Sequence, residues 1–144
     1  MTAFVLDASV TAAWLLPDAA SEHTRRLYAL IRRDEVEPQA PNLWYWECHN
    51  ILATGVNSGR IPAASVEGLW GVLEAIRHRV ELHELAPAQH KAVLDVALET
   101  GLPTFDAAYL WLARSLRLPL ATFDPQQIAA AQRSGVPLLD LSSL

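Results

Sequence analysis

The spacing of apolar and polar residues along the chain predicts five short strands. Each predicted strand is an apolar or alternating run, too short for a helix and bounded by polar residues, Gly or Pro. The first and fourth runs are continuously apolar, which is typical of strands buried in a parallel sheet. The predicted strands span residues 3–6, 36–41, 80–85, 118–122 and 136–141.

Between these runs, apolar residues recur every three or four positions, which predicts amphipathic helices. We expect Ser9 to cap the first helix and Thr104 to cap the sixth, while Gly101 and Gly135 each follow the end of a helix. The predicted helices span residues 10–18, 21–33, 42–57, 65–78, 87–100, 104 to at least 113, and 125–134.

Strands and helices alternate without a linker, a repeat or a low-complexity segment. We therefore expect an α/β fold in one domain, residues 1–144, with a central, mostly parallel sheet of four to five strands and helices on both faces. The composition changes this picture little. A hydrophobic content of 51% is enough for a core, and a single cysteine, Cys48, rules out an internal disulfide and suits a core position.

Composition also narrows the classes of partner. The apolar runs are too short for a membrane span, and the N-terminus lacks the basic start of a signal peptide, so we expect a cytoplasmic protein without a membrane partner. A formal net charge of −5 argues against tight, non-specific binding of nucleic acid. The five histidines show no metal-ligand spacing.

Four acidic residues in apolar surroundings are the candidate functional residues. Asp7 and Asp124 follow predicted strands, Glu47 lies within a helix, and Asp106 lies in the first turn of another. Carboxylates that follow parallel strands meet at one edge of the sheet. Two such charges about 4 Å apart repel by roughly 4 kcal/mol at an effective dielectric of about 20, so a cluster of them requires cations, and hard divalent ions suit oxygen ligands.

Each of these residues also has an ordinary structural explanation. Asp7 and Asp124 can cap turns, Asp106 can pair with a helix dipole, and Glu47 can lie at a partly exposed helix margin. Ser9 can orient a ligand or simply cap a helix. A dehalogenase-type phosphatase would need a second Asp at position 9, and a receiver domain would need paired acids and a late Lys that Lys91 does not supply.

The motifs LDAS, WECHN, FDAAYLWLA and LATFD resemble those of PIN-domain ribonucleases, specifically VapC-type toxins of type II toxin–antitoxin pairs, over essentially the whole chain. The resemblance places Asp7, Glu47, Asp106 and Asp124 on the four acidic positions of the family. It gives supporting positions to three polar residues, which are Ser9, Asn50 and Thr122.

The resemblance implies a metal-dependent endoribonuclease. Mg²⁺ or Mn²⁺ would bind Asp7 and Asp106, with Glu47 and Asp124 completing the cluster, and an activated water would cleave RNA to leave a 5′-phosphate and a 3′-hydroxyl. The further acid that the family often has after the last Asp is absent from Pro125-Gln126-Gln127, so the number of metal ions stays open.

The resemblance also implies partners. Family members form homodimers and bind a small antitoxin protein, for which the helices around Trp14, Leu27, Trp44 and Trp70 are candidate contacts. The alternative is a catalytically inactive PIN-fold module that binds RNA or protein.

Overall fold

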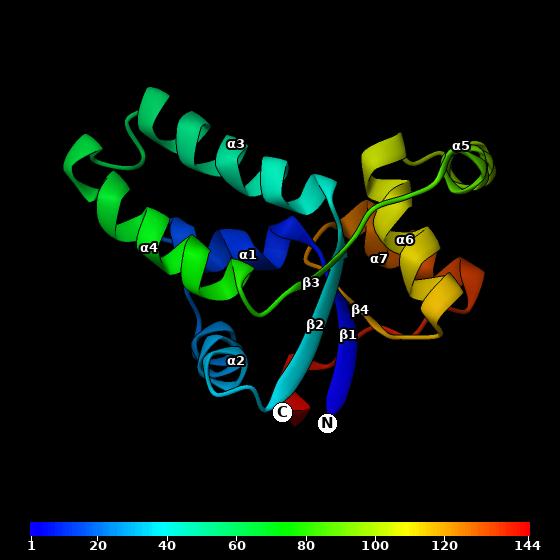
Figure 1. Cartoon of the computed structure of the whole chain (residues 1–144), viewed down its shortest axis with the longest axis horizontal. Coiled ribbons are helices and arrows are strands. Elements are labelled where there is room, and N and C mark those ends of the chain that lie inside the picture. The colour runs from blue at the N-terminus through cyan, green and yellow to red at the C-terminus, as the bar shows by residue number, and fades with distance from the viewer.

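The computed structural model describes all 144 residues and shows one sheet between two groups of helices (Figure 1). The strands lie in the order β3-β2-β1-β4, and all neighbouring strands are parallel. The strands are β1 (Thr2–Leu6), β2 (Val36–Pro41), β3 (Glu81–His83) and β4 (Leu120–Ala121). The prediction of an α/β fold with a parallel sheet of four to five strands is therefore confirmed.

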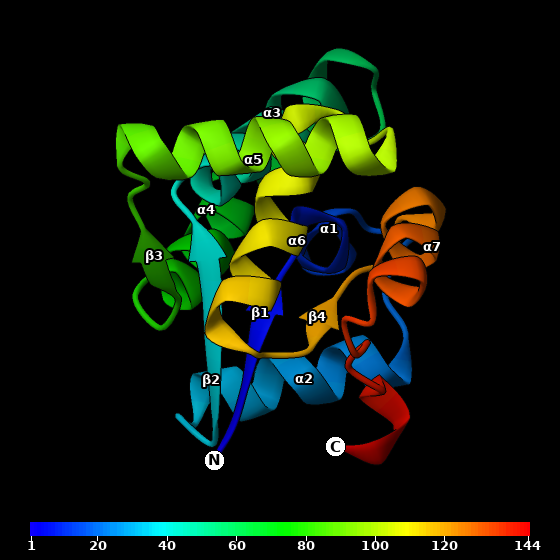
Figure 2. The ribbon, with the colours of Figure 1, turned by 90° about the vertical axis from the view of Figure 1, so that its right-hand side faces the viewer.

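Helices cover both faces of the sheet, as predicted. Figures 1 and 2 show α1 to α4 on one side and α5 to α7 on the other. The helices are α1 (Ala8–Leu15), α2 (Glu22–Arg32), α3 (Leu43–Asn57), α4 (Val66–Arg77), α5 (Pro87–Thr100), α6 (Thr104–Leu116) and α7 (Pro125–Ser134), with 3₁₀ turns η1 (Ala63–Ser65) and η2 (Leu141–Ser143). No helix has the length and apolar character needed to cross a membrane.

Two of the predicted helix caps are corrected. Ser9 does not cap α1; Asp7 does, because it has extended backbone angles at the end of β1 and its carboxylate accepts from the Ser9 backbone N–H. Thr104 is the first residue of α6, and Pro103 holds the capping position. Gly101 ends α5 as predicted, with a φ of 78° that favours glycine.

The prediction of a strand over residues 136–141 was wrong. Only a single parallel bridge forms, between Leu120 and Leu138, and η2 follows at once. The Leu120 N–H donates to the Pro137 carbonyl and the Leu139 N–H donates to the Leu120 carbonyl. Pro137 has no N–H of its own, so the chain cannot extend this pairing into a ladder on that side.

A continuous core of 32 buried residues lies between the sheet and both helix groups. Trp44 is fully buried in it, and its indole N–H donates to the Thr11 hydroxyl at 3.0 Å, which ties α3 to α1. Cys48, one turn further along α3, is also fully buried, as predicted. Since Trp44 and Cys48 hold one side of α3 against the core, Glu47 is left at the edge of that buried side.

The order of the strands determines where a site can form. The chain runs from β1 to β2 and on to β3, and then returns so that β4 pairs with the other side of β1. In open α/β sheets, a crevice forms at such a reversal, outside the carboxyl ends of the strands. Here that crevice lies beside Asp7, which follows β1, and Thr122, which follows β4.

Candidate active site

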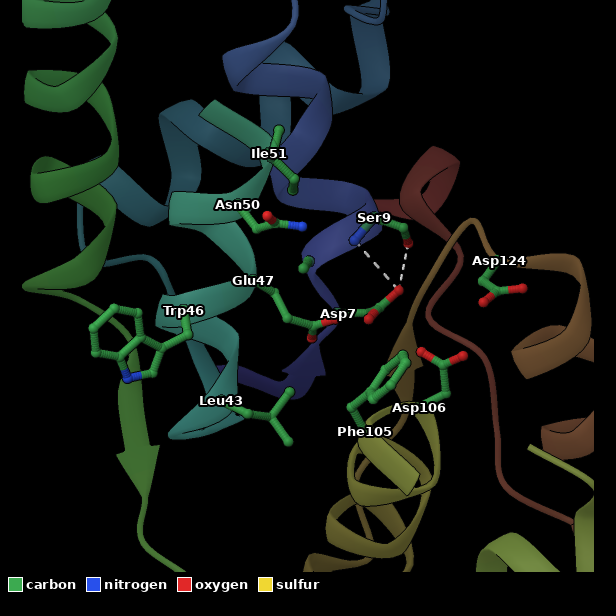
Figure 3. Close-up of a pocket in the computed structure, with 11 residues that line it drawn as sticks. Asp7, Ser9, Leu43, Trp46, Glu47, Asn50, Ile51, Phe105, Asp106 and Asp124 are labelled. Atoms are coloured by element: carbon green, nitrogen blue, oxygen red, sulfur yellow. Dashed lines mark hydrogen bonds between the residues drawn. The ribbon is translucent and has the colours of Figure 1, made fainter. Parts of the chain in front are cut away.

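A pocket of about 540 Å³ opens at the carboxyl ends of β1 and β4 (Figure 3). All four acidic residues singled out from the sequence line it, although they come from four different elements or loops. No Lys, Arg or His side chain contributes to the lining. The lining residues are Asp7, Ala8, Ser9, Leu43, Trp46, Glu47, Asn50, Ile51, Phe105, Asp106 and Asp124.

Asp7 is the most buried of the four, with 4% of its surface exposed. Its Oδ2 accepts hydrogen bonds from the Ser9 hydroxyl at 2.5 Å, from the Thr122 hydroxyl at 2.9 Å and from the Ser9 N–H at 3.3 Å. Burial raises the pKa of Asp7, and these hydrogen bonds oppose the rise. Asp7 is thus held in one orientation with its Oδ1 turned toward the other acids.

Ser9 and Thr122, which the sequence placed in supporting positions, link β1 to β4 at the site. The Phe123 N–H donates to the Ser9 hydroxyl at 2.9 Å, and the Asp124 N–H donates to the Thr122 hydroxyl at 3.1 Å. The loop after β4 is therefore fastened to the residues that also hold Asp7. This fixes where Asp124 enters the pocket.

Asp106 lies in the first turn of α6 and is half-buried. Its Oδ1 accepts a hydrogen bond at 3.2 Å from the side-chain amide of Gln127, which also donates to Asp7 Oδ1 at 3.4 Å. Burial raises the pKa of Asp106, the Gln127 bond opposes this, and the nearby charges of Asp124 and Asp7 add to the rise. Asp7 and Asp106 therefore face one common point.

Glu47 lies across the pocket on α3 and is half-buried (Figure 3). The Tyr109 hydroxyl donates to its Oε1 at 2.5 Å. Burial raises the pKa of Glu47 to about 7, and the charges of Asp7 and Asp106 contribute, while the Tyr109 bond acts in the opposite direction. Near neutral pH, Glu47 can therefore accept or release a proton.

Asp124 and Asn50 complete the polar lining. Asp124 caps α7, because its Oδ1 accepts from the Gln126 N–H at 2.9 Å, and it still lines the pocket. Asn50 lies on the exposed side of α3, about one turn after Glu47. It lines the same pocket, as its predicted supporting position requires.

Two polar neighbours of the acids were not identified from the sequence. Gln127 is fully buried and bridges Asp7 and Asp106, and Tyr109 is fully buried and holds Glu47. The available signal was spacing: Tyr109 follows Asp106 by three residues in α6, and Gln127 follows Asp124 by three residues. Residues three apart in a helix share a face, so Tyr109 lies on the same helix face as Asp106, and Gln127 on the same face as Asp124.

Exposed aromatic side chains border the carboxylates. Trp46 is 75% exposed and Phe105 is 52% exposed, and both line the pocket (Figure 3). Phe123, next to Asp124, is 47% exposed. Large apolar side chains in water are costly unless a partner covers them, so this rim is suited to stacking against planar groups.

The donor set fits a hard divalent cation held by few protein ligands. No group of three or more His, Cys, Asp or Glu side chains lies close enough to hold a metal ion. Asp7 and Asp106 nevertheless each turn one oxygen toward the same Gln127 NH₂ group. Mg²⁺ typically takes one or two carboxylates and completes its octahedron with water and substrate phosphate, so a pair of carboxylates matches the number of protein ligands it usually has.

Comparisons with known proteins connect this fold to solved structures. Neither a model of any protein family nor a curated protein sequence matches the chain. The structure is similar to PAE2754 from Pyrobaculum aerophilum, with 25% identity and a TM-score of 0.69, covering 90% of this chain and 79% of that one.

Two further solved structures share the fold at lower identity. VapC20 of Mycobacterium tuberculosis, a toxin that cleaves the sarcin–ricin loop, is 18% identical with a TM-score of 0.62, covering 88% of this chain and 94% of that one. FitAcB from Neisseria gonorrhoeae is 16% identical with a TM-score of 0.59, and the similarity covers 98% of this chain and 99% of that one.

These similarities define the class of the molecule. The chain has a PIN-like fold, an all-parallel four-stranded sheet flanked by helices. The resemblance to VapC-type toxins that the sequence motifs indicated is confirmed at the level of the fold by the similarity to VapC20.

Proposed function

We propose that this chain is a metal-dependent endoribonuclease and the toxin component of a type II toxin–antitoxin pair. The observation that carries the proposal is the convergence of Asp7, Glu47, Asp106 and Asp124 on one pocket without any basic side chain in its lining. Like charges in partly buried positions raise the free energy of the fold unless a cation joins them. The similarity to a toxin that cleaves RNA supports the same reading.

The roles of the residues follow from their contacts. Asp7 and Asp106 would hold a Mg²⁺ or Mn²⁺ ion, which when bound polarises a phosphodiester and lowers the pKa of a water molecule. Ser9 and Thr122 keep Asp7 oriented. Glu47 would exchange a proton with the attacking water. Asp124 would add negative charge on the side of the pocket opposite Glu47, where α7 begins.

RNA is the proposed substrate, and the rim favours strands with unpaired bases. The net charge of −5 gives the chain little general attraction for phosphates. Trp46 and Phe105, which are exposed beside the acids, offer surfaces on which unstacked bases can pack. Loops and bulges present such bases, as a paired helix does not.

The proposed partners are a second copy of the chain and a small antitoxin, in the cytoplasm. Leu27 and Trp44 are themselves fully buried within the monomer, so other residues of α2 and α3, such as the exposed Trp46, would make the contacts there. Trp14 and Trp70 retain exposure, and Trp14 lines an apolar pocket of about 260 Å³ between α1, α4 and the loops that follow α1 and α3. The antitoxin proposal therefore keeps all four helices, with Trp14 and Trp70 as the candidate side chains that remain accessible.

The central test is RNA cleavage. We expect the purified wild-type chain to cleave RNA in the presence of Mg²⁺ or Mn²⁺ and to lose at least about a hundredfold in rate in the Asp106→Ala variant. Asp95→Ala is a matched control, because Asp95 is an exposed acid on α5 paired only with Lys91. End mapping should give 5′-phosphate and 3′-hydroxyl products.

Growth assays extend this test to the cell. Expression of the wild-type chain should arrest growth, and Asp106→Ala should be harmless while remaining soluble. Co-expression of a small neighbouring gene should restore growth if its product covers the pocket, most simply with an Arg that pairs with the acids. A harmless wild type that cuts no RNA with either metal would favour the non-catalytic binding module.

A further inference from the structure

The buried amide of Gln127 is the feature that the proposed chemistry leaves unexplained. Gln127 is fully buried, in the first turn of α7, and its Nε2 donates to Asp7 Oδ1 at 3.4 Å and to Asp106 Oδ1 at 3.2 Å. Its Oε1 is buried as well and has no hydrogen-bond partner. The NH₂ end of the amide thus donates to two carboxylates, while its oxygen accepts no hydrogen bond.

The orientation of this amide is fixed by charge. An amide oxygen facing two carboxylate oxygens would be repelled by both, whereas the NH₂ group can donate to both. Hydrogen bonds to ionised acceptors are roughly twice as strong as neutral ones, which offsets the cost of a buried, unpaired Oε1. Since no Lys, Arg or His lines the pocket, Gln127 provides the shared positive dipole between Asp7 and Asp106.

We propose that Gln127 is a positioning residue that stands in for the cation in the metal-free protein. Its Nε2 occupies the common point of the same two Oδ1 atoms that a divalent ion would bind, keeps them turned toward each other and reduces their repulsion. This inference rests on the proposed metal-dependent function, because it assumes that a cation binds Asp7 and Asp106.

Because Oε1 has no hydrogen bond, the Gln127 amide can give way to a cation between Asp7 and Asp106. No hydrogen bond on Oε1 holds the amide in place, so when a cation takes over the two carboxylates the amide gives up only its two Nε2 hydrogen bonds.

Thermodynamic linkage gives this role a sign. A group that stabilises the metal-free protein and withdraws on metal binding weakens the affinity for metal. Removing the amide should therefore destabilise the metal-free protein and tighten metal binding. A residue that only fills space in the core would change stability and leave the response to metal unaltered.

The experiment measures thermal unfolding of the full chain with EDTA and with Mn²⁺, together with Mn²⁺ binding by calorimetry, and uses no RNA. Gln127→Met keeps the length of the side chain and removes the amide. We expect its metal-free melting temperature to fall, its rise on adding Mn²⁺ to exceed that of the wild type, and its Kd for Mn²⁺ to decrease by about three- to tenfold. Gln126→Met, an exposed neighbour in the same turn, is the control and should match the wild type.

A second variant, Gln127→Glu, tests the same point with a side chain that keeps the shape of the amide. Gln127→Glu presents oxygen permanently, so it should lower the metal-free melting temperature more than Gln127→Met and bind Mn²⁺ more tightly than the wild type. In an Asp106→Ala background, Gln127→Met should cost less stability than in the wild type, because one of the two acceptors is already gone.

Several outcomes overturn the proposal. An equal Mn²⁺ response in Gln127→Met and the wild type would make Gln127 a packing residue, and so would an equal stability loss in the Asp106→Ala background. If the wild type showed no response to Mn²⁺, no cation would bind Asp7 and Asp106, and Gln127 could not be replacing one. Failure of RNA cleavage alone, with Mn²⁺ binding and its Gln127 dependence intact, would count against the ribonuclease and leave the role of Gln127 standing.

Discussion

At the scale of single residues, Glu47 differs from the three aspartates in how it is held. Asp7 and Asp106 share a donor in Gln127, whereas Glu47 lies across the pocket and accepts from the buried Tyr109 hydroxyl. Burial raises its pKa to about 7, above its usual value of 4.5. Its charge therefore changes in the pH range in which the protein would work.

This shift predicts how stability depends on pH in the metal-free protein. A carboxyl with a raised pKa stabilises the fold fully below pH 4.5, and the contribution is lost as pH rises through about 7, because the folded state then holds an ionised, half-buried group. Glu47→Gln cannot ionise. We therefore expect it to become more stable relative to the wild type between pH 5 and pH 8, by about 1 to 2 kcal/mol after solvent screening.

Urea unfolding in EDTA at pH 5, 6, 7 and 8 measures this difference. Glu84→Gln, which replaces an exposed acid, is the control and should track the wild type at every pH. A constant offset between Glu47→Gln and the wild type across the range would show that the pKa of Glu47 is ordinary.

At the scale of elements, the same side chains both cap helices and line the pocket. Asp7 caps α1, and Asp124 caps α7. An acid at a helix N-terminus is stabilised by the backbone N–H groups and by the helix dipole. The two helices that begin at the carboxyl ends of β1 and β4 therefore fix where these acids point, and local structure contributes to the geometry of the site.

The two roles of Asp124 can be separated by substitution. Asn is as good a capping residue as Asp but carries no charge, so Asp124→Asn should keep the melting temperature near that of the wild type and lower RNA cleavage at least about tenfold. Asp124→Ala should lose the cap as well and cost about 1 kcal/mol of stability. Thermal unfolding and a cleavage assay on both variants check this. If Asp124→Asn retains full cleavage, Asp124 serves α7 alone.

At the scale of the whole molecule, the fold concentrates negative charge at one end of the sheet. The sheet order places the reversal of the chain between β1 and β4, and α3 and α6 bring Glu47 and Asp106 to the same place. The chain carries a net charge of −5 and supplies no cation to this pocket. The metal-free fold therefore carries a repulsion that a divalent ion would relieve.

Metal binding should consequently stabilise the fold. A ligand that binds only the folded state adds about 2.7 kcal/mol at a concentration one hundred times its Kd. We expect Mg²⁺ or Mn²⁺ to raise the melting temperature and Asp106→Asn to remove most of that rise, while making the metal-free protein more stable because one charge is lost. NaCl at equal ionic strength controls for screening. Identical metal responses in Asp106→Asn and the wild type would show that Asp106 binds no metal.

Asp106 is a better probe of this point than Asp7. Asp7 accepts from Ser9, Thr122 and Gln127, so an Asn at that position would turn an N–H group toward at least one of these donors. Asp106 accepts only from Gln127 among the side chains. Substitution of Asp106 therefore changes charge with less disturbance of the hydrogen bonds around it.

The sequence by itself determined the order of the elements and the location of the acids. Residues 36–41 and 43–57 were predicted to within a residue, because hydrophobic periodicity, capping residues and Gly or Pro at the ends act within a few positions of each other. Asp7 and Asp124 follow strands, and parallel strands end at one edge, so their convergence followed from the fold class. Thr122 and Asn50 were found only through the family resemblance, whereas the position of Ser9 two residues after Asp7 already made it a candidate.

Only the tertiary structure decided which side chains meet. Residues 136–141 have the pattern of a strand, yet a single bridge forms, because Pro137 has no N–H to extend the pairing on one side and β4, the neighbouring strand, is only two residues long. Gln127 and Tyr109 are ordinary helix residues in the sequence. Their contacts with Asp7, Asp106 and Glu47 depend on how α6 and α7 pack against the rest of the fold, and the pKa of Glu47 depends on the resulting burial. Local periodicity carries no information about such distant neighbours, which is why these features emerge only when the chain is folded.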